Sequence, residues 1–376
     1  MNSPDRLLDR PIRTTDRLVS ASTWEHGGRL WPSNEQLTLT CCRVIDETHD
    51  VKTFQFCTED GLPVRFEPGQ FMTVSARVGE RAVERCYTIS SPPTRPYLLS
   101  ITVKRAPDGV MSNWLHDNMK PGTRLRAYGP SGRFTPIDAV APKFLFLSAG
   151  SGVTPLMSMT RASIDLGLDR DIVFVHSART PSDIIFRNEL AHLATLSPRL
   201  RVLSVCEGLG DEPDWTGPTG RLSLKFLQEC VPDFAEREIF TCGPGGYMSA
   251  VRQLLHEGGH NPDRYHQESF NFAEEVASQA VEPASDAAQA TYTVKLSRSS
   301  RSFTMSASET VLAAAKKAGV PIPSSCSQGI CGTCKTRVLE GTVDMNHQGG
   351  IRDREVQKGF RLLCCSRPTS DLLLDL

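Results

Sequence analysis

The sequence lacks the features that mark membrane-spanning, secreted and nucleic-acid-binding proteins. The 376-residue chain has no run of about 18 consecutive apolar residues, so a transmembrane helix is not expected. Its first residues, MNSPDRLLDRPIRTTDRLVS, lack the apolar core of a signal peptide, and a cytoplasmic protein is therefore expected. The formal net charge of −1 leaves no basic excess to neutralise nucleic-acid phosphates, although a local charged patch for a protein partner is compatible with it.

Length and patterning predict several folded domains. A chain of 376 residues exceeds one ordinary hydrophobic core. Residues 1–36 are polar and Arg-rich and are expected to form an arm. Residues 37–138 hold short β-like runs between turn signals such as EPG, SPP and KPG. Such runs predict a small antiparallel β-barrel.

Residues 139–272 follow a different pattern. Apolar strand-like runs alternate with helical segments, including a helix expected over 181–196, and this alternation predicts a parallel, doubly wound α/β domain. Such sheets bind ligands at the carboxyl ends of their strands. Residues 273–290 are rich in Ala, Glu, Ser and Gln and are interpreted as a linker. Residues 291–376 form the last domain, which begins with a hairpin and a helix closed by Gly319.

Cysteine is abundant, with twelve residues, and five of them crowd near the C-terminus. Cys326, Cys331 and Cys334 have C-x4-C-x2-C spacing, which is that of a plant-type [2Fe–2S] cluster completed by a distant fourth cysteine. A zinc site or inert buried thiols are the alternatives. Zinc sites usually add a second closely spaced pair, for which the adjacent Cys364 and Cys365 are poorly suited. The iron–sulfur interpretation is therefore favoured.

Two glycines in the cysteine loop support the same interpretation. Gly329 and Gly332 can adopt positive φ without strain and let backbone amides approach the sulfurs, where such hydrogen bonds tune the redox potential. The whole of 291–376 resembles a plant-type ferredoxin, which implies a β-grasp fold. The spacing that this family commonly places before its fourth ligand spans residues 335–363 and selects Cys364. Cys365 is then expected to point the opposite way along an extended backbone.

In the expected barrel, RCYTISS resembles the R-x-Y-[ST] signature of the ferredoxin–NADP reductase superfamily. The resemblance implies that Arg85 binds the flavin pyrophosphate, Tyr87 packs on the ring and Thr88 donates near N5, with Ser90 also in the binding segment. An ordinary strand with alternating residues is the alternative. The segment GVMSNWLHDN strengthens the match, because it resembles the family helix whose N-terminus cradles the pyrophosphate of FAD rather than FMN. That N-terminus comprises Gly109, Val110, Met111 and Ser112.

The segment LSAGSGVTPLMSM resembles the pyridine-nucleotide loop of the same superfamily. It is not G-x-G-x-x-G, because Pro155 replaces the third glycine. Gly150 and Gly152 permit close backbone approach, and the helix that begins near Thr154 and Pro155 offers amides to a pyrophosphate.

The segment FTCGPGGYM resembles the family's C-G-P motif, which implies that Cys242 and Gly243 flank the nicotinamide and that Pro244 is also a cofactor-binding residue. Simple packing is the alternative for a lone buried cysteine.

Two further segments carry candidates for nucleotide and flavin contacts. HSARTPSDIIF contains Ser177 and Arg179 where the adenosine ribose is expected. Arg179 suits a 2′-phosphate and hence NADPH, or is a solvated loop arginine, but the segment resembles NADH-using relatives and NADH is favoured. RYHQESFNF supplies Glu268 and Phe270, an acid and an aromatic that close over the flavin in relatives. Surface packing is the alternative for Glu268. Thr88, Cys242 and Glu268 are the candidate catalytic residues.

Residues 40–376 as a whole resemble reductase components of Rieske-type oxygenases, especially those that serve demethylases of glycine betaine and related quaternary amines. The implied electron path is NAD(P)H, FAD, [2Fe–2S] cluster and oxygenase partner, because flavin links a two-electron donor to a one-electron acceptor. We find no Ser–His–Asp set or paired catalytic carboxylates for chemistry on an organic substrate, so the final reaction is expected on the partner. A reductase for another acceptor, such as a hybrid-cluster protein or a different iron oxygenase, is one alternative. A redox-sensing Fe–S flavoprotein is the other.

Overall fold

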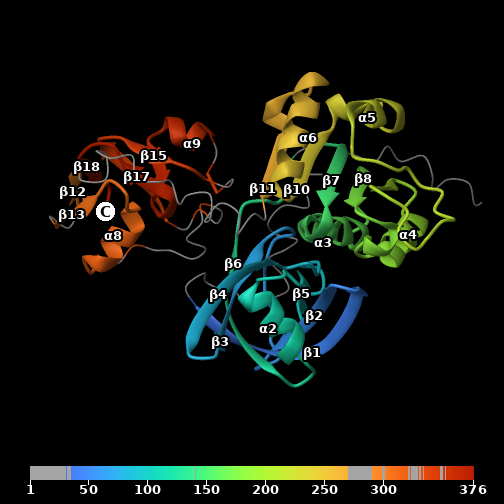
Figure 1. Cartoon of the computed structure of the whole chain (residues 1–376), viewed down its shortest axis with the longest axis horizontal. Coiled ribbons are helices and arrows are strands. Elements are labelled where there is room, and N and C mark those ends of the chain that lie inside the picture. Colours follow the sequence, from blue (N-terminus) through green and yellow to red (C-terminus); the bar gives the residue numbers. More distant parts are fainter. Residues whose placement is uncertain are drawn as a thin grey trace, which may run out of the picture.

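The chain forms three lobes, which follow one another along the sequence (Figure 1). The computed structural model describes residues 31, 35–139, 141–269, 290–298 and 301–320, and 322, 329, 332, 334–347, 350–351 and 353–376. Within these residues, no helix combines the length and the apolar character needed to cross a membrane. The expected linker 273–290 falls almost entirely outside the described residues.

The first lobe is an antiparallel barrel with strand order β4-β3-β6-β1-β2-β5. Its elements are β1 (Gln36–Thr48), β2 (Val51–Thr58), β3 (Phe71–Val78), β4 (Arg81–Thr88), β5 (Leu99–Lys104), α2 (Val110–Asn118) and β6 (Arg124–Ser131). A bridge between Ile89 and Ile101 joins the two edges of the sheet and closes it. Alternate side chains such as Phe54 and Phe56 are fully buried, which is the period-2 pattern of a half-buried strand. The antiparallel barrel predicted from the sequence is confirmed.

The second lobe is a parallel sheet with order β11-β10-β7-β8-β9, covered by helices. Its elements are β7 (Lys143–Ala149), α3 (Val153–Asp165), β8 (Asp171–Ala178), α4 (Arg187–Leu196), β9 (Leu200–Cys206), α5 (Leu224–Cys230), β10 (Glu238–Gly243), α6 (Gly245–Glu257) and β11 (Tyr265–Ser269). The doubly wound fold is confirmed. The sequence analysis did not predict β11 as a strand, although Tyr265 to Ser269 pair in parallel with β10 along its length.

The helix expected over 181–196 is wrong in its first half. A 3₁₀ turn occupies Pro181–Asp183, and α4 begins only at Arg187. Between them Ile184, Ile185 and Phe186 are all buried. Ile184 packs with Ala178 and Cys206, whereas Ile185 and Phe186 pack in the separate cluster of Phe146 and Phe174, so the three side chains enter two different hydrophobic clusters. The chain therefore leaves the helical path, and Phe186 adopts φ +60° before α4 starts.

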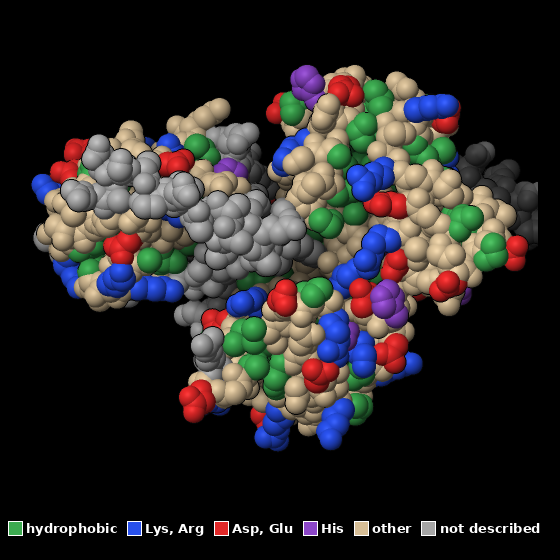
Figure 2. All heavy atoms as spheres, in the orientation of Figure 1, with side chains coloured by type: hydrophobic (Ala, Val, Ile, Leu, Met, Phe, Trp, Pro, Cys, Tyr) green, Lys and Arg blue, Asp and Glu red, His purple; other side chains and the backbone are tan. Residues whose placement is uncertain are grey.

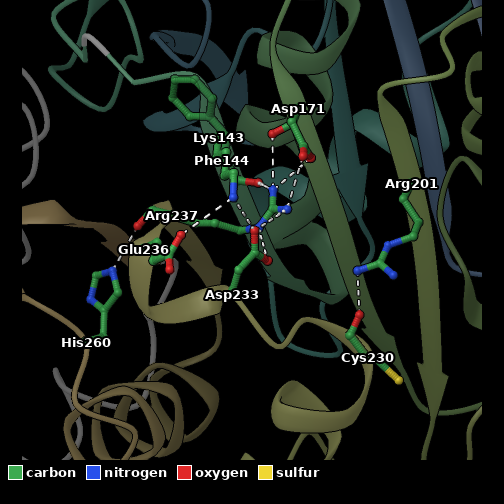
Figure 3. Close-up of polar contacts among 9 residues, drawn as sticks. All are labelled: Lys143, Phe144, Asp171, Arg201, Cys230, Asp233, Glu236, Arg237 and His260. Carbon is green, nitrogen blue, oxygen red and sulfur yellow. Dashed lines mark hydrogen bonds and ion pairs between the residues drawn. The ribbon is translucent and has the colours of Figure 1, made fainter.

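The amino ends of the parallel strands are joined by a buried arginine, Arg237 (Figure 3). Its guanidinium donates to Asp171 at the start of β8 (2.8 Å), to Asp233 (2.8 and 3.0 Å) and to the carbonyl oxygen of Phe144 in β7 (3.1 Å). Burial alone would raise the pKa of Asp233, but its bonds to Arg237 and Lys143 outweigh this and lower it to about 2. This network stabilises the edge of the sheet opposite the expected nucleotide site.

The third lobe contains a five-stranded mixed sheet with order β13-β12-β18-β14-β16 and a two-stranded sheet, β15-β17. Its elements are β12 (Thr291–Leu296), β13 (Ser302–Ser306), α8 (Val311–Lys317), β14 (Lys335–Glu340), β15 (Val343–Met345), α9 (Asp353–Gln357), β16 (Phe360–Leu362), β17 (Ser366–Pro368) and β18 (Leu372–Leu374). The expected hairpin is β12–β13. The expected helix is α8, which is followed by Gly319 at φ +66°. This arrangement agrees with the predicted ferredoxin fold.

Candidate functional site

Three of the predicted flavin residues, Arg85, Tyr87 and Thr88, lie on β4. Arg85 is exposed, and its guanidinium donates to the carbonyl oxygen of Glu84 (2.7 Å). Burial raises the pKa of the Tyr87 phenol. Thr88 is 5% exposed, and its Oγ1 has no hydrogen-bond partner among the described residues. Leaving such a hydroxyl buried and unpaired costs about 1–3 kcal/mol, so Thr88 is suited to a partner that the protein itself does not supply.

Ser90 differs from its neighbours, because its polar groups are used inside the barrel. Its amide donates to the carbonyl oxygen of Ser100 (2.8 Å), and its hydroxyl lies 3.0 Å from that of Thr102. These bonds help to close the barrel between the end of β4 and β5. The structure therefore gives the Ser90 side chain a supporting role rather than a free donor for a flavin.

Helix α2 contacts β3 and β4 of the barrel (Figure 1). The first amides of a helix have no acceptor within it, and the first turn of α2 carries no acidic side chain that would oppose an anion. The Ser112 hydroxyl donates to the carbonyl oxygen of Gly109 (3.1 Å). A Cβ at Gly109 would lie 2.3 Å from that hydroxyl. Gly109 therefore permits a compact turn, in which the amides of Val110, Met111 and Ser112 are suited to a phosphate group.

The predicted nucleotide loop packs directly on the C-G-P motif. Gly150 has φ +51°, and Gly150–Gly152 form a 3₁₀ turn that leads into α3. A Cβ at Gly152 would lie 2.2 Å from the carbonyl oxygen of Cys242 and 2.6 Å from the amide nitrogen of Gly243. Only glycine fits there without moving the backbone. The Thr154 hydroxyl donates back to Ser151 (3.0 Å) and holds the start of the helix, in which Pro155 needs no amide acceptor.

A row of polar side chains crosses the sheet near the carboxyl ends of its strands. Strand register aligns Glu268 with Cys242, Cys242 with Ser148, Ser148 with His176, and His176 with Ser204. The Ser148 hydroxyl lies 2.8 Å from Nδ1 of His176, and burial lowers the pKa of His176 to about 4, so this imidazole is neutral. The sequence analysis missed Ser148 and His176, whose signal is only a polar residue inside an apolar run.

Two of the three candidate catalytic residues meet in this row. Burial raises the pKa of Glu268 to about 8, and Oε2 of its carboxyl group has no hydrogen-bond partner among the described residues. Burial and the neighbouring Glu268 raise the pKa of the Cys242 thiol well above its usual value, so the thiol is protonated at neutral pH. Thr88 comes from the barrel. Phe270 lies outside the described residues.

A cavity of about 420 Å³ opens at the carboxyl ends of the parallel strands, where the barrel meets the sheet. Four predicted nucleotide residues line it: Gly150, Ser177, Arg179 and Pro244. Figure 2 shows basic and acidic side chains gathered along the crevice between these two lobes. The sequence analysis missed several lining residues, including Asp50, Lys104, Asp183, Glu207 and Tyr247. Asp50 and Lys104 belong to the barrel, and no local sequence pattern connects them to the nucleotide loop.

Arg179 is 63% exposed and lies between two carboxylates. Its guanidinium is 3.6 Å from Asp50 and 3.9 Å from Asp183. Burial alone would raise the pKa of Asp50, but Lys104 (3.2 Å) and the other neighbours outweigh this and lower it. Asp50 therefore stays ionised and, with Asp183, offsets the positive charge of Arg179.

Of the four predicted cluster ligands, Cys334 and Cys364 are described and buried, whereas Cys326 and Cys331 lie outside the described residues. The amide of Gly329 in the cysteine loop donates to Sγ of Cys364 (3.1 Å). Gly329 and Gly332 both have φ +73°, a conformation that glycine adopts without strain. Cys364 thus lies against the loop that carries the other predicted ligands, and an amide directed at its sulfur suits a thiolate.

The backbone of the cysteine pair corrects one prediction. Leu363–Cys365 form a 3₁₀ turn, so the argument from an extended chain does not apply. Cys365 is half-buried, its thiol donates to the carbonyl oxygen of Leu362 (3.5 Å), and a Cβ at Gly329 would lie 2.8 Å from its sulfur. Both side chains therefore lie near Gly329. They differ in their bonds, because the Cys364 sulfur accepts an amide proton and the Cys365 thiol donates.

The third lobe touches the barrel beside this region. Arg133, which follows β6, pairs with Glu355 of α9 (3.0 Å), and Glu355 also pairs with Lys335 (2.5 Å). Lys335 directly follows Cys334 in the chain. One carboxylate therefore connects the barrel to the residue next to a predicted cluster ligand.

Comparison with known proteins agrees with this division. Three families match successive parts of the chain: the oxidoreductase FAD-binding domain (residues 39–135), the oxidoreductase NAD-binding domain (146–253) and the 2Fe-2S iron-sulfur cluster binding domain (294–369). The chain thus has domains for the three expected cofactors, FAD, NAD and a [2Fe–2S] cluster.

Whole-chain relatives extend the match. The glycine betaine monooxygenase reductase subunit of Pseudomonas aeruginosa is 45% identical over 365 residues, which cover 95% of this chain and 98% of that protein. The stachydrine N-demethylase reductase subunit of Rhizobium meliloti is 40% identical over 339 residues, which cover 88% and 94%. Among solved structures, phthalate dioxygenase reductase superposes with a TM-score of 0.58 at 28% identity and covers 91% of this chain and 98% of that one. The chain therefore belongs to the family of oxygenase reductase components that combine FAD-binding, NAD-binding and [2Fe–2S] domains.

Proposed function

We propose that this reductase takes electrons from NADH and passes them through FAD and a [2Fe–2S] cluster to a Rieske-type oxygenase that demethylates glycine betaine or a related quaternary amine. The observation that carries the choice of partner is the 45% identity, over 95% of the chain, to a reductase subunit named for glycine betaine. A second relative, at 40% identity, is named for N-demethylation of stachydrine.

Residues of the barrel would hold FAD. Arg85 and the α2 amides at Gly109–Ser112 suit the pyrophosphate, Tyr87 suits the ring, and the unpaired hydroxyl of Thr88 suits a ring nitrogen. Bound FAD would supply the conversion of one hydride into single electrons. The protein's part is to place the ring and to exclude water from it.

The carboxyl edge of the parallel sheet would hold the nucleotide. Gly150, Gly152 and the start of α3 suit its pyrophosphate, and Ser177 suits the adenosine ribose. Cys242, Gly243 and Glu268 suit the nicotinamide, because they lie together at the carboxyl ends of β10 and β11, against the nucleotide loop. The domains would extend over 37–138, 139–272 and 291–376, with 1–36 as an arm and 273–290 as a linker.

The environment of Arg179 supports NADH over NADPH. A 2′-phosphate placed against Arg179 would also face Asp50 and Asp183, both within 4 Å of that guanidinium. Like-charge repulsion from two carboxylates opposes a dianionic phosphate, whereas a ribose hydroxyl can donate to a carboxylate. Ordinary NADH therefore suits this end of the cavity better.

The cluster would be held by Cys326, Cys331, Cys334 and Cys364. The Gly329 amide at Sγ of Cys364 supports the fourth assignment. The test compares Cys364→Ser with its neighbour Cys365→Ser. We expect Cys364→Ser to remove the cluster absorbance and abolish cytochrome c reduction, while NADH still bleaches the flavin. Cys365→Ser should keep both, and the reverse result would contradict the assignment.

The partner is tested by reconstitution. The visible spectrum of the purified protein should first show flavin and [2Fe–2S] bands together. With NADH and a Rieske oxygenase that acts on glycine betaine, demethylation should then be coupled to NADH oxidation. Full flavin with no NADH turnover would contradict the reductase activity and favour a sensor. Turnover without coupling would contradict only the partner.

One observation favours a second acceptor class. The ferredoxin reductase component of 3-ketosteroid-9-alpha-monooxygenase of Mycobacterium tuberculosis is 34% identical over 349 residues, which cover 89% of this chain and 94% of that protein. A steroid-hydroxylating oxygenase is therefore the comparison partner in the same assay, and coupling to it alone would replace the quaternary-amine proposal.

A further inference from the structure

One side of helix α3 is hydrogen-bonded along its length to the segment that follows β4. We call β4 the flavin strand, because it carries the predicted flavin residues Arg85, Tyr87 and Thr88. The Ser158 hydroxyl donates to the carbonyl oxygen of Ser91 (2.8 Å), and Nη1 of Arg161 donates to that of Ser90 (2.5 Å). Further along, Asp165 accepts from Arg95 (2.7 and 3.0 Å). The spacing of 158, 161 and 165 places all three on one face of the helix. The helix of one lobe thus holds the backbone of the other.

Arg161 is the buried member of this set, at 8% exposure. Its Nε and Nη2 donate to both carboxylate oxygens of Glu189 in α4 (2.7 and 2.6 Å). Its guanidinium also lies over the ring of Phe186, 4.7 Å from the centroid. Arginine stays charged at any ordinary pH, so a buried guanidinium persists only when its donors are paired in this way. The three partners together fix its position.

The residue beneath Arg161 carries local strain. Phe186 is the only non-glycine residue with positive φ in the described part of the chain, at +60°. A bulky side chain in that conformation costs roughly 1–3 kcal/mol. The ring lies under Arg161 while the backbone turns into α4, which bears Glu189. The strained turn thus positions two of the three groups that contact the guanidinium, the ring of Phe186 and the carboxylate of Glu189.

Arg161 also lies on a short route, made of one hydrogen bond and two stretches of chain, between the predicted flavin site and the predicted nicotinamide site. Ser90, which accepts its bond, is two residues from Thr88, the candidate flavin donor. In the other direction, α3 continues back to Gly150–Gly152, which packs on Cys242 at the nicotinamide edge. A shift at Arg161 would therefore move the flavin strand relative to the nucleotide loop.

We propose that Arg161 is a positioning residue for hydride transfer, which sets the separation of the flavin strand from the nicotinamide loop. This inference rests on the proposed function, in which a hydride passes from NADH to FAD, oxidises NADH to NAD⁺ and reduces FAD by two electrons. Such a step requires close alignment of donor and acceptor, and a misplacement of about 1 Å can slow it about 100-fold. Arg161 touches neither reacting ring and acts through Ser90.

The test measures anaerobic flavin reduction by NADH in a stopped-flow instrument for the holoprotein. Arg161→Met should slow reduction at saturating NADH by about 10- to 100-fold, while the dissociation constant of NADH changes by less than about threefold. The long-wavelength charge-transfer absorbance, which needs stacked flavin and nicotinamide rings, should weaken as well. Arg161→Lys should recover part of both. The matched control is Arg95→Met, an exposed arginine bonded to the same helix, with an effect below about twofold.

Separate outcomes overturn this inference and the proposed function. An unchanged rate and charge-transfer band in Arg161→Met, with only lower thermal stability or weaker FAD retention, would make Arg161 merely structural. Should that variant fail to fold, Glu189→Gln decides: it leaves the guanidinium in place but weakens its anchor. We expect reduction to slow by about three- to tenfold, and a wild-type rate would overturn the inference. Failure of the wild-type protein to be reduced by NADH would instead contradict the proposed function.

Discussion

The two ends of the parallel sheet treat buried polar groups in opposite ways. At the amino end, Arg237 is held by Asp171, Asp233 and a backbone carbonyl oxygen (Figure 3). At the carboxyl end, Oε2 of Glu268 and Nε2 of His176 are buried without a partner among the described residues. Buried polar atoms in native proteins are nearly always paired, so unpaired ones mark a place where a ligand or strain is accommodated.

The amino end of the sheet therefore contributes mainly to stability, and the carboxyl end mainly to function. The amino end joins β7, β8 and β10 through charges that satisfy one another. At the carboxyl end, the unpaired atoms of Glu268 and His176 lower the stability of the fold, and they lie where the nucleotide is expected to bind. A substitution at the amino end should therefore lower the free energy of unfolding and leave the rate of flavin reduction unchanged. A substitution at the carboxyl end should mainly affect the reaction with the nucleotide. Four experiments test that contrast.

The largest effect is expected for Arg237→Met. It leaves Asp171 and Asp233 without their common partner, and breaking a buried ion pair typically costs about 3–5 kcal/mol. The lower end of that range is expected here, because both carboxylates are partly exposed. The free energy of unfolding, measured in urea, should fall by about 3 kcal/mol, while the folded fraction keeps its rate of flavin reduction. Arg201→Met, at an exposed arginine that bonds the carbonyl oxygen of Cys230 apart from this network in Figure 3, should change stability by less than about 0.5 kcal/mol. Equal losses in both variants would remove the contrast.

The next effect is expected for Gly152→Ala at the other end. The new methyl group would lie 2.2 Å from the carbonyl oxygen of Cys242 and must displace the nucleotide loop. Flavin reduction by NADH should slow about 100-fold, while dithionite still reduces the flavin. The control is Gly208→Ala, where nothing lies within 4 Å of the added carbon. A wild-type rate in Gly152→Ala would show that the loop does not need this contact.

An effect that is smaller per pH unit is expected for Glu268→Gln. Burial raises the pKa of Glu268 to about 8 from an ordinary 4.5, so between these values the folded protein keeps a proton that the unfolded chain has released. Stability therefore falls as pH rises through this window, by at most about 1.4 kcal/mol per pH unit, and levels off above pH 8. The variant should lose that slope in urea unfolding from pH 5 to 9. The exposed Glu257→Gln should keep it, and parallel curves for wild type and Glu268→Gln would contradict the burial argument.

The smallest effect is expected for Asp50→Asn in the nucleotide cavity. Neutralising this carboxylate frees Arg179 for a 2′-phosphate, so kcat/KM for NADPH relative to NADH should rise about fivefold, as expected for one partly exposed charge. The control is Asp46→Asn, an exposed residue of the same barrel that pairs with Lys52. If the ratio stays constant, Arg179 does not face the ribose.

The sequence predicted best those features of the sites whose residues lie close together in the chain. The spacing of the cysteines and the positive φ of Gly329 and Gly332 belong to a single loop. The strand–loop–helix order around Gly150–Gly152 is likewise contiguous. Alternation of apolar runs with helices predicted the parallel sheet, because burial on both faces demands continuous apolar strands.

It failed where the deciding neighbour is distant in the sequence. The helix predicted from Pro181 is replaced at first by a 3₁₀ turn, because Ile184 packs in one hydrophobic cluster while Ile185 and Phe186 pack in another. β11 was missed because its pairing with β10 is what makes it a strand. The Cys364–Cys365 backbone was expected to be extended, but it forms a 3₁₀ turn against Gly329.

The sequence by itself therefore determined the order of the three domains, their cofactor chemistry and most residues expected to touch each cofactor. Only the tertiary structure decided how these half-sites combine. It brought Asp50 and Lys104 of the barrel to the nucleotide cavity, aligned Glu268 with Cys242, and bonded Arg161 of one lobe to Ser90 of another. The reason is physical. Ligand spacing and glycine freedom act over a few residues, whereas burial, charge compensation and hydride-transfer distance depend on groups that meet only after the chain has folded.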